Sequence, residues 1–216
     1  YFKFFSKTMT AVLDDDPIDV SVSHTKVSVL KNVIPFNKTL LMFSDQTQFQ
    51  VTSTDSLTPK TITTEVVTEF ESTPKCSPVS LGNSVYFASD KGTSSSVREY
   101  FVDVNTVTND ASEVTAHVPA YVPANLFVLA ASTTEDLVVA LSTDERNAIY
   151  VYKVYWNGDE KAQSAWGKFL LDAADVILHI GFINSVMYAV IQRADGIYLE
   201  SMNLQEGYTS TGFDYQ

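Results

Sequence analysis

The sequence has few of the residues that build metal sites and catalytic centres. Its 216 residues include one cysteine, Cys76, and three histidines, His24, His117 and His179. A single cysteine excludes a disulfide framework within the chain and a cysteine-rich zinc site. The histidines are far apart, in or near strand-like runs, where a packed or surface histidine is more common than a ligand. The sequence also lacks a Gly-rich phosphate loop, a G-x-S-x-G elbow and an H-E-x-x-H motif, so we expect no catalytic residue, no cofactor and no metal site.

Long apolar runs and an excess of basic residues are absent as well. No run approaches the roughly 18 apolar residues of a membrane-spanning helix, and we expect neither a membrane span nor a signal peptide. The 14 Lys and Arg against 26 Asp and Glu give a formal net charge of −12. This balance argues against a protein that reads nucleic-acid sequence, because such a protein carries a basic patch. It is compatible with a wall past which DNA slides, since acidic side chains repel phosphates, and equally with ordinary solubility.

Short runs of β-branched and aromatic residues are abundant, most clearly over residues 178–202. Three apolar runs, 178–182, 186–191 and 197–199, are separated by turns at 184–185 and 193–196. Each run is short for a helix, and its period is closer to two than to 3.6. The Asp-Gly pair in the second turn is typical of a tight hairpin with positive φ. The stretch therefore predicts an antiparallel meander.

A similar sequence pattern, in which a polar pair is followed by an apolar strand and a polar turn, recurs at residues 38–44, 83–89 and 135–142. From Leu40 to Val85, Leu137 and Val186, the spacings are 45, 52 and 49 residues. This is the length of one four-stranded blade of a β-propeller. We predict an all-β, β-propeller-like fold with about four repeats of antiparallel four-stranded blades. A β-sandwich with evenly spaced strands is the alternative.

The repeats suggest a division of the chain into two parts. Residues 1–32 form an N-terminal lead-in segment with an aromatic cluster, residues 1–5, and an acidic stretch. Residues 33–216 form the propeller-like domain, with repeats at about 33–76, 77–118, 124–172 and 175–216. The third repeat has four strand-like runs, whereas the fourth lacks a convincing last strand. The chain does not begin with Met, and we expect it to be a fragment of a longer chain in which the ring of blades need not be complete.

Several local features carry more specific expectations. The Thr-rich residues 60–70 predict a solvated outer strand, and residues 89–96 predict a long, flexible turn. Pro119 and Pro123 place a junction between two repeats at 117–123. Trp166 is interpreted as a packing residue between blades.

Three adjacent aspartates, Asp14, Asp15 and Asp16, precede Pro17. Their structural interpretation is an N-cap or an Asx-turn. A metal or acid/base site is the alternative, but it needs a second cluster of ligands, and none is evident. A glycosidase needs two carboxylates that face each other across a cleft. Asp14 or Asp16 with Asp195 stays open as such a pair, although nothing in the sequence selects it.

A family likeness runs through nearly the whole chain in one order. It is carried by residues 1–5 (YFKFF), 13–23 (LDDDPIDVSVS), 33–36 with 40–49, 83–89, 117–123 and 163–166. These runs resemble the family of tail tubular protein B, the tail nozzle protein of T7-like short-tailed phages. In the last run Ala165 is inserted into the family's Gln-Ser-Trp stretch, and the likeness is weakest in the turns 91–96 and 195–207.

The resemblance implies a structural protein of the virion tail, made in the host cytoplasm. Such a nozzle subunit forms the DNA ejection channel and joins the adaptor to the tail fibres. The implied partners are further copies of the chain, as a hexamer in the assembled tail, tail tubular protein A (the adaptor), the tail fibre protein, and double-stranded DNA that passes without sequence-specific binding. The alternative is a tail-associated glycan-binding or polysaccharide-degrading β-propeller protein, which requires a carboxylate pair with one raised pKa.

Overall fold

The computed structural model describes residues 11–22, 29–103, 106, 108–158, 160–205, 209–210 and 213–214. All regular structure in this part of the chain is β-strand, which confirms the predicted all-β class. The aromatic cluster at residues 1–5 and His24 lie outside the described residues. The chain divides into two compact units, Tyr1–Pro74 with Phe101–Ala111, and Lys75–Tyr100 with Ser112–Gln216.

The first unit contains one antiparallel meander. Its strands follow chain order and are β1 (Leu30–Phe36), β2 (Thr39–Ser44), β3 (Gln48–Ser53) and β4 (Ile62–Thr68). β4 is an edge strand whose side chains are mostly half-buried or exposed, which confirms the prediction for residues 60–70. The buried amide of Gln48 donates to the carbonyl of Phe70 at 2.9 Å and accepts from the Thr68 hydroxyl at 2.8 Å. This amide therefore fixes the end of β4 against β3.

The second unit contains three sheets of three or four strands. The boundary between the two units passes through β7 and β8 of the first of these sheets. One sheet has the order β5 (Val79–Leu81), β6 (Ser84–Asp90), β7 (Ser95–Asp103) and β8 (Thr108–Glu113). The next has the order β12 (Glu160–Leu170), β11 (Ala148–Asn157), β10 (Leu137–Ser142) and β9 (Leu126–Ser132). The last has β13 (Val176–Ile183), β14 (Val186–Arg193) and β15 (Gly196–Asn203). A two-stranded ribbon, β16 (Thr209–Ser210) and β17 (Phe213–Asp214), follows.

The recurring sequence pattern lies at the same position in each of the four sheets. Leu40, Val85, Leu137 and Val186 all lie in the second strand of their sheet, namely β2, β6, β10 and β14. The repeat therefore corresponds to one antiparallel meander, as the spacing predicts. The fourth meander has three strands among the described residues, and no sheet closes on itself.

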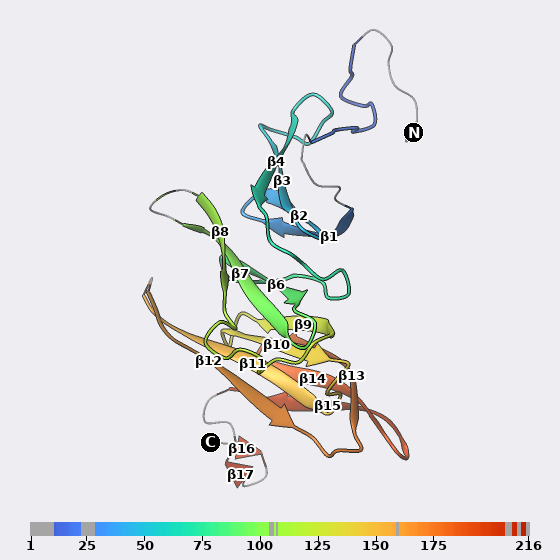
Figure 1. Cartoon of the computed structure of the whole chain (residues 1–216), viewed down its shortest axis with the longest axis vertical. Helices are drawn as coiled ribbons and strands as arrows, with labels where there is room; N and C mark the ends of the chain where they lie inside the picture. The colour runs from blue at the N-terminus through green and yellow to red at the C-terminus, as the bar shows by residue number, and fades with distance from the viewer. Residues whose placement is uncertain are drawn as a thin grey trace. The chain divides into compact units, whose positions relative to one another are not determined.

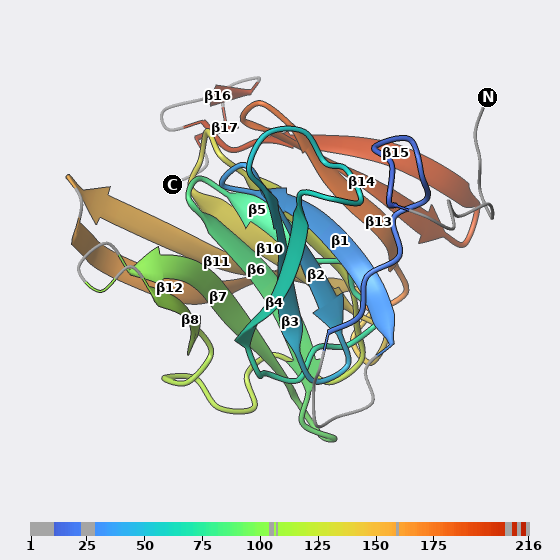
Figure 2. The same cartoon turned by 90° about the horizontal axis from the view of Figure 1, so that it is seen from above.

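The sheet β9–β12 is buried on both faces by strict alternation of side chains along its central strands. Val138 and Ala140 on β10 join a cluster with residues of the β5–β8 sheet, among them Tyr86 and Val97. Val139 and Leu141 point the other way, into a cluster with β13 and β14. Figure 1 accordingly shows β9–β12 between β6–β7 and β13–β15, and in Figure 2 β6 and β7 lie across β10 and β11. Three successive meanders are thus stacked face to face.

Trp166 has the predicted packing role within the first of these clusters. Its ring packs against the buried cluster, with its centroid 5.1 Å from that of Tyr152. Its indole nitrogen donates to the carbonyl of Val114 at 2.9 Å. This bond joins β12 to the segment that leads from β8 to β9, where the junction at residues 117–123 was expected.

Two turn predictions are wrong in instructive ways. Residues 89–96 form a short hairpin turn between β6 and β7 rather than a long flexible loop. The Ser89 and Ser96 hydroxyls lie 2.7 Å apart across the hairpin, so both serines are buried with a partner. In the turn at 193–196, φ at Gly196 is not positive; a positive φ instead occurs at Asn184 in the preceding turn.

Candidate functional site

The aspartates at residues 14–16 have a local structural role. Asp16 Oδ2 accepts the backbone N–H of Leu13 at 2.9 Å and so closes a turn. Asp14 forms an exposed ion pair with Lys60 at 3.3 Å. The Asp16 N–H also donates to the Leu13 carbonyl at 3.2 Å, so residues 13–16 form a β-turn that the Asp16 side chain closes from its end. An Asx-turn instead has its side chain bonded two residues further on, and no helix follows within residues 11–22, so the turn expected here is present as neither an Asx-turn nor an N-cap. In the part of the chain that the structure describes, no group of three or more His, Cys, Asp or Glu side chains could hold a metal ion.

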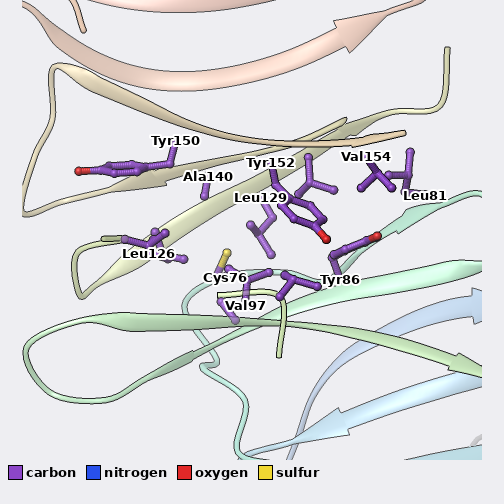
Figure 3. Close-up of a cluster of buried hydrophobic side chains, with 14 of the residues drawn as sticks. Cys76, Leu81, Tyr86, Val97, Leu126, Leu129, Ala140, Tyr150, Tyr152 and Val154 are labelled. Carbon is purple, nitrogen blue, oxygen red and sulfur yellow. The ribbon is translucent and has the colours of Figure 1, made fainter. Parts of the chain in front are cut away.

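Cys76 is buried at the interface between the first two sheets of the second unit. Figure 3 shows its sulfur beside Val97 and Leu129, and its exposed fraction is 1%. Burial, with a smaller contribution from the negative charge of Asp90, raises the pKa of the Cys76 thiol from 9.0 to about 12. A buried, protonated thiol is a poor nucleophile, because the thiolate is the reactive form.

A buried carboxylate, Glu99, lies in the same interface and was missed by the sequence reading. Its side chain accepts a hydrogen bond from Ser84 at 3.0 Å and a charge-assisted one from Lys161 of β12. The Tyr86 hydroxyl is a third partner, and burial together with the charge of Glu99 raises the pKa of Tyr86. On β7, Val97 and Glu99 are buried, whereas Arg98 between them is half-buried. The position of Glu99 two residues after an apolar strand residue was the sequence signal that could have predicted its burial. The group therefore connects two sheets.

An open hollow with several charged residues in its lining lies at one end of the β13–β15 sheet. It is lined by Leu171, Asp172, Ala174, Asp175, Arg193, Ala194, Asp195 and Glu200. Arg193 donates to Asp175 at 3.2 Å and also to Glu200. Asp195 accepts the Tyr198 hydroxyl at 2.8 Å, and the Arg193 guanidinium lies 5.5 Å from the centre of the Tyr198 ring.

This arrangement does not suit glycosidic acid/base chemistry. A general acid needs a carboxyl group whose surroundings favour the neutral form, as an apolar pocket does. Asp175 and Glu200 instead both form ion pairs with the Arg193 guanidinium, so neither lies in an apolar pocket. Asp195 lies in the second unit, whereas Asp14 and Asp16 belong to the first. His117, in a turn, and His179, on β13, are both exposed.

The face of the β13–β15 sheet that is turned away from β9–β12, termed here the outer face, carries exposed apolar side chains. Ile183, Ile197 and Leu199 are 64%, 66% and 71% exposed. Cross-strand pairing puts Val186 beside Ile183 and Val190 beside Leu199, on the same face. Exposed apolar patches of this kind mark surfaces that bind other protein elements.

Comparison with known proteins identifies the family. A sequence model described as bacteriophage nozzle protein matches residues 1–216. The chain belongs to the bacteriophage nozzle protein family. It is 32% identical over 218 residues to the tail tubular protein gp12 of Escherichia phage T7, an alignment that covers 100% of this chain and 27% of that relative.

Membership of the nozzle family shows in which part of the virion this chain belongs. It is a component of the phage tail in the virion. In the described part of the chain no helix is long and apolar enough to cross a membrane.

Proposed function

We propose that residues 1–216 are part of a tail tubular protein B, the nozzle subunit of a short-tailed phage. The observation that carries this proposal is the family match over the whole chain. Because the chain spans only 27% of the length of the T7 relative, we further propose that it belongs to a longer chain, termed here the parent polypeptide. The parent polypeptide would form a hexamer around the DNA ejection channel.

Within this proposal, residues 33–216 are a β-propeller-like domain that follows a lead-in segment at 1–32. Its blades are the repeats at about 33–76, 77–118, 124–172 and 175–216. The face-to-face stacking of successive meanders in the second unit supports it, since propeller blades pack in this way. Completion of the ring would require β-structure from outside these repeats.

The proposed partners follow from the same role. They are further copies of the parent polypeptide, tail tubular protein A as the adaptor, and the tail fibre protein. Double-stranded DNA would pass along the channel without sequence-specific binding. The net charge of −12 supports this part, because an acidic wall repels phosphates and prevents retention of the moving DNA.

The mass of the parent polypeptide in solution, with and without its adaptor, tests the proposal. A six-fold assembly, alone or formed on the adaptor, is the expected result. A stable monomer that ignores the adaptor would contradict it. A reducing-sugar assay on capsular or cell-wall polysaccharide is the companion measurement, and turnover there would favour the polysaccharide-degrading alternative instead.

A further inference from the structure

The two faces of the β13–β15 sheet are unequal in burial but similar in composition. On the inner face Met187, Ala189 and Ile191 are at most 5% exposed, because they pack against the β9–β12 sheet. The outer face carries seven apolar residues, which are Val176, Ile183, Val186, Tyr188, Val190, Ile197 and Leu199, together with the polar residues His179, Gln192, Ser201 and Asn203. β-Branched and large apolar residues on both faces are typical of a sheet that is covered on both sides. The outer face therefore has the composition of an interface.

The same sheet has one strand fewer than its neighbours. β15 pairs with β14 along its whole length, from Gly196 to Asn203. Among the described residues no strand pairs with its other edge. An open edge of eight residues with exposed Ile197 and Leu199 is an aggregation risk that folded proteins normally cover.

Chain order in the second unit points to the occupant. The β5–β8, β9–β12 and β13–β15 sheets stack in the order in which they occur along the chain. The connection from β12 to β13 is only five residues long, 171–175. Short connections place consecutive elements next to each other in space. The two-stranded ribbon β16–β17 comes next in the chain but is too short to form a full meander. By this rule the first complete meander beyond that ribbon would stack on the outer face of β13–β15.

We propose that the outer face and free edge of β13–β15 are covered by a further β-meander of the parent polypeptide, outside residues 1–216. Its apolar face packs on the apolar residues of the outer face, and one of its strands pairs with β15. About three-quarters of the length of the T7 relative lies outside the stretch that aligns with this chain, so ample chain is available in such a protein. The inference rests on the proposed stacking of blades and not on the nozzle role.

Thiol labelling of the parent polypeptide tests this inference directly. Leu199→Cys and the milder Ser201→Cys put a thiol on the outer face, where Ser201 is exposed and pairs with Tyr188. Thr93→Cys, in the exposed turn between β6 and β7, is the matched control. The native Cys76 is buried and adds little background. Each rate is divided by the rate for the same variant in denaturant.

The thiols introduced at positions 199 and 201 are expected to react at least ~100-fold more slowly than the thiol of the Thr93→Cys control. A covered thiol reacts only when the structure above it unfolds locally, which is rare. This protection should persist in the dissociated monomer. Labelling as fast as in the control would show an open face and overturn the inference. Protection that disappears on dilution would also overturn it, because a second copy would then be the cover. Failure to bind the adaptor would contradict the nozzle role without affecting this result.

Discussion

At the scale of single residues, Glu99 depends on three partners. A carboxylate that is 4% exposed is costly unless hydrogen bonds and a cation offset its lost hydration. Ser84 and Tyr86 come from the neighbouring strand β6, whereas Lys161 is 62 residues away in the chain, on β12. The Glu99–Lys161 pair therefore stabilises one particular docking of two sheets.

Lys161→Met should destabilise the protein by about 1–3 kcal/mol, less than for a fully buried pair because the Lys161 side chain is 28% exposed. Urea denaturation gives the free energy of unfolding. Adding Glu99→Gln to Lys161→Met should restore part of the loss, since no unpaired charge is then buried.

Lys60→Met is the matched control for this prediction. Lys60 pairs with Asp14, and the two side chains are 48% and 68% exposed. An exposed pair is screened by water, so the change should cost at most about 0.5 kcal/mol. Equal losses for the Lys60 and Lys161 variants would contradict the role given to Glu99.

Cys76 provides a pH-dependent prediction. The pKa of its thiol is raised to about 12 in the folded state, so the contribution to stability is complete below pH 9 and is lost as the pH rises from 9 towards 12. Wild type should lose more stability than Cys76→Ala over this interval. At pH 8 a thiol reagent should label Cys76 only after denaturation, and rapid labelling of the native chain would contradict its burial.

At the scale of elements, β10 shows why the middle sheet of the second unit holds its neighbours together. Val138 and Val139 are both 0% exposed but belong to different clusters. Each valine to alanine change should destabilise by about 1–2 kcal/mol, because it leaves a small cavity. The double variant should show nearly the sum, since the two cavities share few partners.

Val33→Ala is the control for this pair, because Val33 is 57% exposed on β1 and should cost little. Thermal and urea unfolding of the four variants provide the comparison. If one of the two β10 variants were as harmless as the control, the sheet would be packed on one face only.

The sequence was sufficient for the elements with strong local patterns. Leu137 and its equivalents predict four meanders, because β-strand periodicity and turn residues act over a few positions. The error at Ser89–Ser96 arose because serines favour turns, whereas these two satisfy each other across the hairpin. The bond from Lys161 to Glu99 and the polar hollow at Arg193 combine distant segments, so spacing along the chain contains no direct signal for them.

At the scale of the whole molecule, the basic residues leave little surface for DNA. At least seven of the 14 Lys and Arg are in ion pairs with carboxylates, namely Lys60, Lys91, Arg98, Lys153, Lys161, Lys168 and Arg193. Phosphate binding by the paired residues would have to displace these carboxylates. Together with a net charge of −12, this pairing favours net repulsion of DNA by the chain.

The chain should consequently not retain double-stranded DNA even at about 50 mM salt, where phosphate contacts are strongest. Fluorescence anisotropy of a labelled duplex, with a basic protein of similar size as the positive control, provides the measurement. Binding that weakens steeply with added salt would reveal a basic patch, because each phosphate contact releases counterions. Such a patch would slow DNA in transit, and the proposal of an acidic channel wall would then be wrong even if the hexamer forms.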